Sequence, residues 1–209
     1  MITSLPNLLT LARVAAVPAI VALLYWPDAT GSWLACGLFA AAAITDFFDG
    51  YLARAMAQQS AFGRFLDPIA DKLLVAAVLL MLAGTGRIDG LALIAAAVIL
   101  CREILVSGLR EFLAGLSVTV PVSELAKWKT TIQMVAIGIL IVGDAGPADI
   151  PVRTIGEAGL WVAAILTIVT GYDYLRAGLG HMGIGARPEP SYDDGEGDEP
   201  AERRLPSRR

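Results

Sequence analysis

Six long apolar stretches separated by short polar connections dominate the chain. The stretches cover about residues 7–26, 33–48 (continuing toward 57), 65–83, 91–113, 125–142 and 155–175. Proline, glycine and aspartate residues mark the connections between them. A helix needs roughly 20 mostly apolar residues to cross a bilayer, and the stretches have about that length. The pattern predicts an all-α integral membrane protein with six transmembrane helices.

The composition supports a membrane protein, because 56% of the 209 residues are hydrophobic. A soluble domain of this size does not need so much apolar surface. The end of the chain differs from the rest, since residues 189–202 carry seven acidic side chains and no basic one. We therefore expect a six-helix membrane catalytic domain over residues 1–182, followed by a disordered tail of acidic and basic residues over 183–209.

The basic residues predict the orientation in the membrane. With six spans, most lysine and arginine residues fall on the side of the two termini, and only Arg87 and Arg153 fall on the other. The positive-inside rule then places both termini in the cytoplasm, and we expect the cell (inner) membrane. Cys36 and Cys101 lie in apolar stretches and are expected to be small buried residues. No nucleic-acid partner is predicted.

Four aspartates at one end of the second and third stretches are the main candidates for chemistry. Asp46 and Asp49 are spaced i,i+3, and Asp67 and Asp71 are spaced i,i+4, so each pair shares one helix face. Charges at membrane depth cost at least ~2.5–3.5 kcal/mol each on insertion scales, and they mark functional sites by default. We therefore expect the two helices to present four carboxylates toward each other.

Clustered carboxylates repel one another unless a cation lies between them. Carboxylate oxygens without histidine or cysteine favour a hard ion, so Mg²⁺ or Mn²⁺ is the predicted cofactor. Two such ions would bind a pyrophosphate and stabilise the leaving oxygen. The alternative is that the acids only pair with Arg54, Arg64 and Lys72 at the membrane surface. That explanation suffices for any single aspartate and is less suited to four.

The segment Asp46-x2-Asp49-Gly50-x2-Ala53-Arg54-x8-Gly63-x3-Asp67-x3-Asp71 resembles the full signature of the CDP-alcohol phosphatidyltransferases. Residues 7–13 resemble the opening of the first helix in this family. Residues 102–111 and 127–133 are similar to the phosphatidylglycerophosphate synthase branch. One departure is Ala126, where the family has glycine, and it affects local helix packing rather than the chemistry. The resemblance covers about residues 5–175.

The resemblance implies a six-helix membrane fold, a homodimer and an active site at the cytoplasmic face. It implies CDP-diacylglycerol as the donor, and the branch implies sn-glycerol 3-phosphate as the acceptor. On this basis Asp71 is the expected general base. The expected metal ligands are Asp46, Asp49, Asp67 and Asp71. The expected CDP pocket contains Asp49, Gly50, Ala53, Arg54 and Gly63, with Arg54 on a phosphate.

Asn7, Thr10 and Arg13 are spaced three residues apart near the start of the first stretch. We predict a polar stripe that faces the nucleotide and include Asn7 and Thr10 in the CDP-binding set. A role as helix cap and interfacial anchor is about as well supported by the sequence.

The acceptor carries a phosphate, so its pocket needs fixed cations. The candidates are Arg102, Arg110, Lys127 and Lys129. The alternative is that these residues anchor lipid head groups. That alternative is about equally good for Lys127 and weaker for Arg102, which lies deeper in an apolar stretch.

Three other functions fit parts of the pattern. Within the family, the acceptor could be an inositol phosphate, serine or phosphatidylglycerol. Intramembrane prenyltransferases also use paired aspartate motifs, but their two motifs lie far apart, whereas here both fall within residues 46–71. A metal transporter would carry its acids near the middle of the bilayer, whereas these acids lie at one membrane face.

Overall fold

The computed structural model describes residues 5–26, 28–56, 61–115 and 124–181. For residues 5–6, 46–56, 61–65, 67, 177 and 179–181 the description is limited to the backbone. The predicted tail over 183–209 lies outside the described residues.

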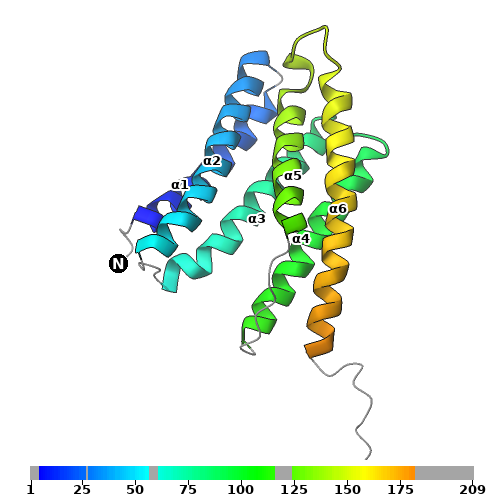
Figure 1. The fold of residues 1–209 in the computed structure, drawn as a ribbon. Coiled ribbons are helices and arrows are strands. Elements are labelled where there is room, and N and C mark those ends of the chain that lie inside the picture. Colours follow the sequence, from blue (N-terminus) through cyan, green and yellow to red (C-terminus); the bar gives the residue numbers. More distant parts are fainter. Residues whose placement is uncertain (1–4, 27, 57–60, 116–123, 182–209) are drawn as a thin grey trace, which may run out of the picture.

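Within the described ranges the protein has six α-helices and no strand (Figure 1). The helices are α1 (Leu5–Tyr25), α2 (Ala29–Met56), α3 (Ala61–Gly84), α4 (Ala92–Gly115), α5 (Glu124–Val142) and α6 (Val152–His181). A short 3₁₀ turn, η1 (Gly143–Ala145), follows α5. The predicted all-α, six-helix fold is confirmed.

Four described helical segments are long and apolar enough to cross a membrane. They are Asn7–Tyr25, Ala92–Gly115, Glu124–Ala145 and Val152–Arg176. Helix α2 contributes a shorter apolar segment, Ala29–Thr45, and then continues through the aspartate region. Many large apolar side chains point outward, among them Leu80, Ile104 and Ile165. In a bilayer these side chains face lipid, which is as apolar as the bundle interior.

The helices form two groups that meet at the pair α2 and α5. Helix α1 packs against α2 and α3, whereas α6 packs against α4 and α5. Figure 1 shows α5 and α6 side by side along most of their length. Between them, small residues allow close approach, because a Cβ at Gly156 would lie only 2.7 Å from Leu140 Cγ. Gly159 similarly faces Ala136.

Arg87 connects α2 and α5 by hydrogen bonds at the end of the bundle opposite the aspartates. It follows α3, and its guanidinium donates to Ser32 Oγ on α2 (2.9 Å) and to the carbonyl oxygen of Ile141 on α5. Burial lowers the pKa of Arg87, and the nearby Asp144 carboxylate partly offsets this effect. One side chain thus connects three elements that are far apart in sequence.

Candidate active site

Continuous helix runs through the aspartate motif on both sides of the connection at 57–60. Helix α2 extends to Met56, so the spacing of Asp46 and Asp49 puts them on one helix face. Helix α3 begins at Ala61, so Gly63, Asp67 and Asp71 follow one another at one-turn intervals. Only four residues of sequence separate Met56, the end of α2, from Ala61, the start of α3. The side chains of the motif before Asp71 lie outside the described part.

Asp71 is half-buried on α3 and lines a cavity of about 330 Å³ between α2, α3 and α5. Thr130 and Thr131 of α5 and Ala43 of α2 line the same cavity. The Asp71 carboxylate also attracts the ammonium of Lys129 electrostatically. The predicted base therefore faces a cavity and lies near one of the predicted acceptor cations.

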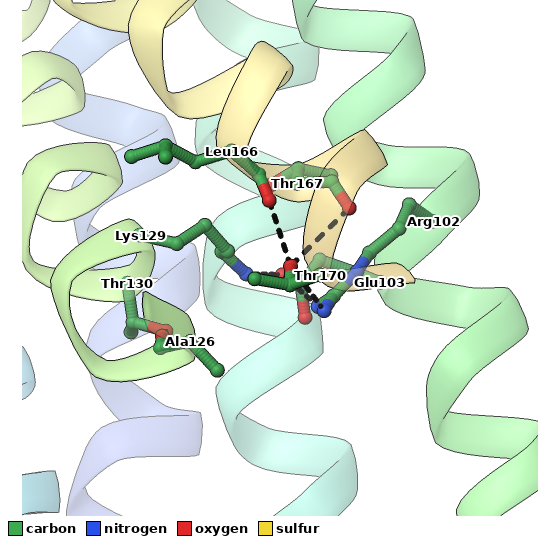
Figure 2. A network of polar contacts seen from close by, with 8 residues as sticks. All are labelled: Arg102, Glu103, Ala126, Lys129, Thr130, Leu166, Thr167 and Thr170. Atoms are coloured by element: carbon green, nitrogen blue, oxygen red, sulfur yellow. Dashed lines mark hydrogen bonds and ion pairs between the residues drawn. The ribbon is translucent and has the colours of Figure 1, made fainter. Parts of the chain in front are cut away.

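A buried polar network joins α4, α5 and α6 next to this cavity (Figure 2). The Lys129 ammonium donates to the Glu103 carboxylate, and only 2% of the Lys129 side chain is exposed. Arg102 Nη1 lies 3.5 Å from Glu103 Oε1, and Arg102 Nη2 donates to Thr170 Oγ1 at 3.0 Å. The Thr170 hydroxyl in turn donates to the Leu166 carbonyl oxygen at 2.8 Å. The network thus fixes two cations around one carboxylate.

The network itself holds two cations and one carboxylate, and the nearby Asp71 carboxylate attracts one of the cations, Lys129. Arg102 and Lys129 share the single Glu103 carboxylate, and Arg102 Nε has no hydrogen-bond partner among the described residues. Gly171 lets α6 close over Arg102, because a Cβ there would lie 3.2 Å from Arg102 Cγ. Buried cations held in this way favour an anionic ligand, and arginine is well suited to phosphate.

The other two predicted acceptor cations are exposed. Arg110 lies over the ring of Tyr174, with 5.8 Å between Cζ and the ring centroid. Lys127 pairs with Glu124 at 2.7 Å at the start of α5, and both side chains are largely solvent-accessible. The structure therefore brings together Arg102 and Lys129, and leaves Arg110 and Lys127 outside the network.

Glu103 and Thr170 belong to the network although the sequence pattern predicts no role for either. An acidic residue within an apolar segment, as at Glu103, is the kind of signal that marks a site. Glu103 also lines a second cavity of about 490 Å³ between α3 and α4, together with Lys72 and Glu111. Thr170 carries no such signal, because threonine is common in membrane helices and only packing shows its partner.

Asn7, Thr10 and Arg13 are all buried on the face of α1 that packs against its neighbours. The predicted polar stripe therefore lies inside the bundle. Its contact with a nucleotide stays a prediction, and so does its alternative role as an anchor.

The donor chemistry of the aspartate motif fits a hard divalent cation. Aspartate side chains offer carboxylate oxygens, and the motif follows the end of α2 and the start of α3 in the chain. The described residues contain no group of three or more histidine, cysteine or acidic side chains that could hold a metal ion. Three of the four predicted ligands, Asp46, Asp49 and Asp67, have side chains outside that part of the chain.

These features define an integral membrane protein whose described residues form six helices, with Asp71 at a cavity close to the buried cation Lys129. Residues 3–169 match the CDP-alcohol phosphatidyltransferase family, and the chain belongs to this family.

The chain aligns with nearly the whole length of several curated relatives. A protein of Rickettsia bellii is 51% identical over 174 residues, which are 83% of this chain and 94% of the relative. A protein of Cereibacter sphaeroides is 41% identical, with 86% of this chain and 97% of the relative covered. A protein of Pseudomonas fluorescens is 42% identical, with 89% and 95% covered. All three are named CDP-diacylglycerol–glycerol-3-phosphate 3-phosphatidyltransferase.

Proposed function

We propose that this protein transfers the phosphatidyl group from CDP-diacylglycerol to sn-glycerol 3-phosphate, which yields phosphatidylglycerophosphate and CMP. The observation that carries the proposal is the 51% identity, over 83% of the chain, to a relative named for this reaction. The buried cations Arg102 and Lys129 support an acceptor that carries a phosphate.

In the proposed mechanism Asp71 is the general base. Its carboxylate takes the proton of the acceptor hydroxyl, and the resulting oxygen attacks the phosphorus that carries diacylglycerol. A new phosphorus–oxygen bond forms while the bond to CMP breaks, and the electron pair of that bond leaves with CMP. The position of Asp71 at a cavity beside Thr130 and Thr131 supports this role.

We propose that Asp46, Asp49, Asp67 and Asp71 hold Mg²⁺ or Mn²⁺. When bound, the ion supplies charge neutralisation for the donor pyrophosphate and for the departing CMP. Gly50 and Ala53, one turn apart on α2, leave room for the nucleotide, and Arg54 and Gly63 complete its pocket. Asn7 and Thr10 extend this pocket from the buried face of α1.

The acceptor phosphate is proposed to bind Arg102 and Lys129, with Arg110 and Lys127 at the entrance. Because Lys129 is buried and paired with Glu103, the phosphate must join or replace that carboxylate. The basic residues favour cytoplasmic termini and a cytoplasmic active site in the inner membrane. A homodimer is proposed from the resemblance to the family.

Release of labelled CMP tests the function. Purified protein in mixed micelles should release CMP from CDP-diacylglycerol only when glycerol 3-phosphate and Mg²⁺ or Mn²⁺ are both present. Chelation should stop the release, and adding the ion back should restore it. Equal release with inositol phosphate, serine or phosphatidylglycerol, or release without an acceptor, would contradict the proposed acceptor.

A further inference from the structure

The shortest polar contact of the Arg102 guanidinium is with Thr170 of α6. Arg102 Nη2 donates to Thr170 Oγ1 at 3.0 Å, whereas the contact of Nη1 with Glu103 is 3.5 Å long and lies at the outer limit for a hydrogen bond. Arg102 Nε has no hydrogen-bond partner among the described residues. The orientation of this guanidinium therefore depends more on Thr170 than on the neighbouring carboxylate.

The backbone of α6 fixes the Thr170 hydroxyl in turn. Arginine can only donate, so Thr170 Oγ1 accepts from Arg102. The single hydroxyl hydrogen of Thr170 is then directed to the Leu166 carbonyl oxygen, at 2.8 Å (Figure 2). Only 3% of Thr170 is exposed, so water does not compete for either bond. One buried side chain thus transmits the position of the α6 backbone to Arg102.

This contact gains importance when an anion binds to the two cations. The Glu103 carboxylate also pairs with Lys129, and an incoming phosphate competes with it for both cations. Thr170 carries no charge, so it does not repel a phosphate as Glu103 does. Fixing a long side chain before the ligand arrives removes part of the entropy cost of binding. A guanidinium held by Thr170 therefore stays oriented while Glu103 gives way.

We propose that Thr170 is a positioning residue for the acceptor, because it holds Arg102 in the orientation that binds the phosphate of glycerol 3-phosphate. The inference rests on the proposed function. The alternative is that Thr170 only supports the packing of α6 against α4. A packing role changes the stability of the fold, whereas a positioning role changes the KM of the acceptor and leaves the KM of the donor as it is.

Three substitutions on α6 distinguish these roles. Thr170→Val keeps the shape of the side chain and removes the oxygen that accepts from Arg102, and Thr170→Ser restores that oxygen. Thr167→Val is the matched control, since Thr167 lies one turn earlier on α6, is fully buried, and its hydroxyl has no hydrogen-bond partner among the described residues. CMP release is measured while glycerol 3-phosphate and CDP-diacylglycerol are varied in turn.

We expect Thr170→Val to raise KM for glycerol 3-phosphate about fivefold, because Arg102 has to be ordered anew at each binding event. Its kcat and its KM for the donor should stay as in the wild type. Thr170→Ser should recover most of the acceptor affinity, and Thr167→Val should keep all of it. An unchanged acceptor KM in Thr170→Val, or an equal rise in both KM values, would overturn the proposal. A lower acceptor KM would also overturn it, since Thr170 would then compete with the phosphate for Arg102.

Binding of inorganic phosphate separates the positioning role from the proposed reaction. A bound anion raises the unfolding temperature of the purified protein in detergent, and sodium chloride at equal ionic strength controls for screening. The phosphate concentration that gives half of this effect should rise about fivefold in Thr170→Val and stay unchanged in Thr167→Val. A wild type that shows this pattern but transfers nothing to glycerol 3-phosphate would refute the reaction and keep the positioning role. Equal phosphate dependence in the wild type and all three variants would refute the positioning role.

Discussion

Lys129 on α5 and Glu103 on α4 form an ion pair inside the helix bundle, with Lys129 almost completely buried. The partners are 26 residues apart in sequence, and Arg102 approaches the same carboxylate. Removing one member of a buried pair is costly because the other charge is left uncompensated. Glu103 therefore stabilises the fold, and its carboxylate also competes with an acceptor phosphate for Lys129 and Arg102.

The change Glu103→Gln should lower the free energy of unfolding by about 3 kcal/mol, because Lys129 loses its counter-charge. Thermal unfolding in detergent measures the effect. Glu124→Gln is the matched control, since Glu124 pairs with the exposed Lys127, and such surface pairs contribute roughly 0–1 kcal/mol. Similar losses in the two variants would show that burial of the Lys129–Glu103 pair does not matter.

Gly171→Ala should impair acceptor binding by pressing on Arg102. The new Cβ would lie 3.2 Å from Arg102 Cγ and 3.4 Å from Nε, so the guanidinium has to shift. We expect KM for glycerol 3-phosphate to rise on the order of tenfold while KM for the donor stays unchanged, since an arginine–phosphate contact contributes roughly 1.5–3 kcal/mol. Gly108→Ala on α4 is the control, because a Cβ there meets nothing within 4 Å. A rise in both KM values would place Arg102 outside the acceptor pocket.

Asp71→Asn should abolish transfer and leave donor binding in place. The amide cannot accept the proton of the acceptor hydroxyl, and a general base contributes on the order of 10²–10⁴-fold in rate. Single-turnover CMP release measures the rate, and equilibrium binding of labelled CDP-diacylglycerol measures the affinity. Asp149→Asn, in the exposed connection between α5 and α6, should behave as the wild type. Near-normal turnover of Asp71→Asn would remove Asp71 from the role of base.

The sequence predicts the helices because their stabilising interactions are local and periodic. The apolar stretches and the breaks around Gly86 and Gly90 define the ends of α3 and the start of α4, where both glycines have positive φ. The aspartate spacing likewise follows from the helix period. The convergence of Arg102 and Lys129 on Glu103 does not follow from the helix period, because it depends on how α4 and α5 each pack against α6. For the same reason sequence could not separate these cations from the exposed Arg110 and Lys127.

The contacts of Arg87 indicate that substituting it should reduce the stability of the fold without reducing catalytic activity. Arg87 donates to Ser32 and to the Ile141 carbonyl at the end of the bundle opposite the aspartates. In Arg87→Met both acceptors lose a charged donor, and we expect unfolding to become easier by about 2–3 kcal/mol. CMP release per folded molecule should stay unchanged, since the reacting groups lie at the other end. Arg153→Met is the control, because its contacts with Asp89 and Glu157 are surface ion pairs. If Arg87→Met lowered kcat at a temperature where it is fully folded, the two ends of the bundle would have to be coupled.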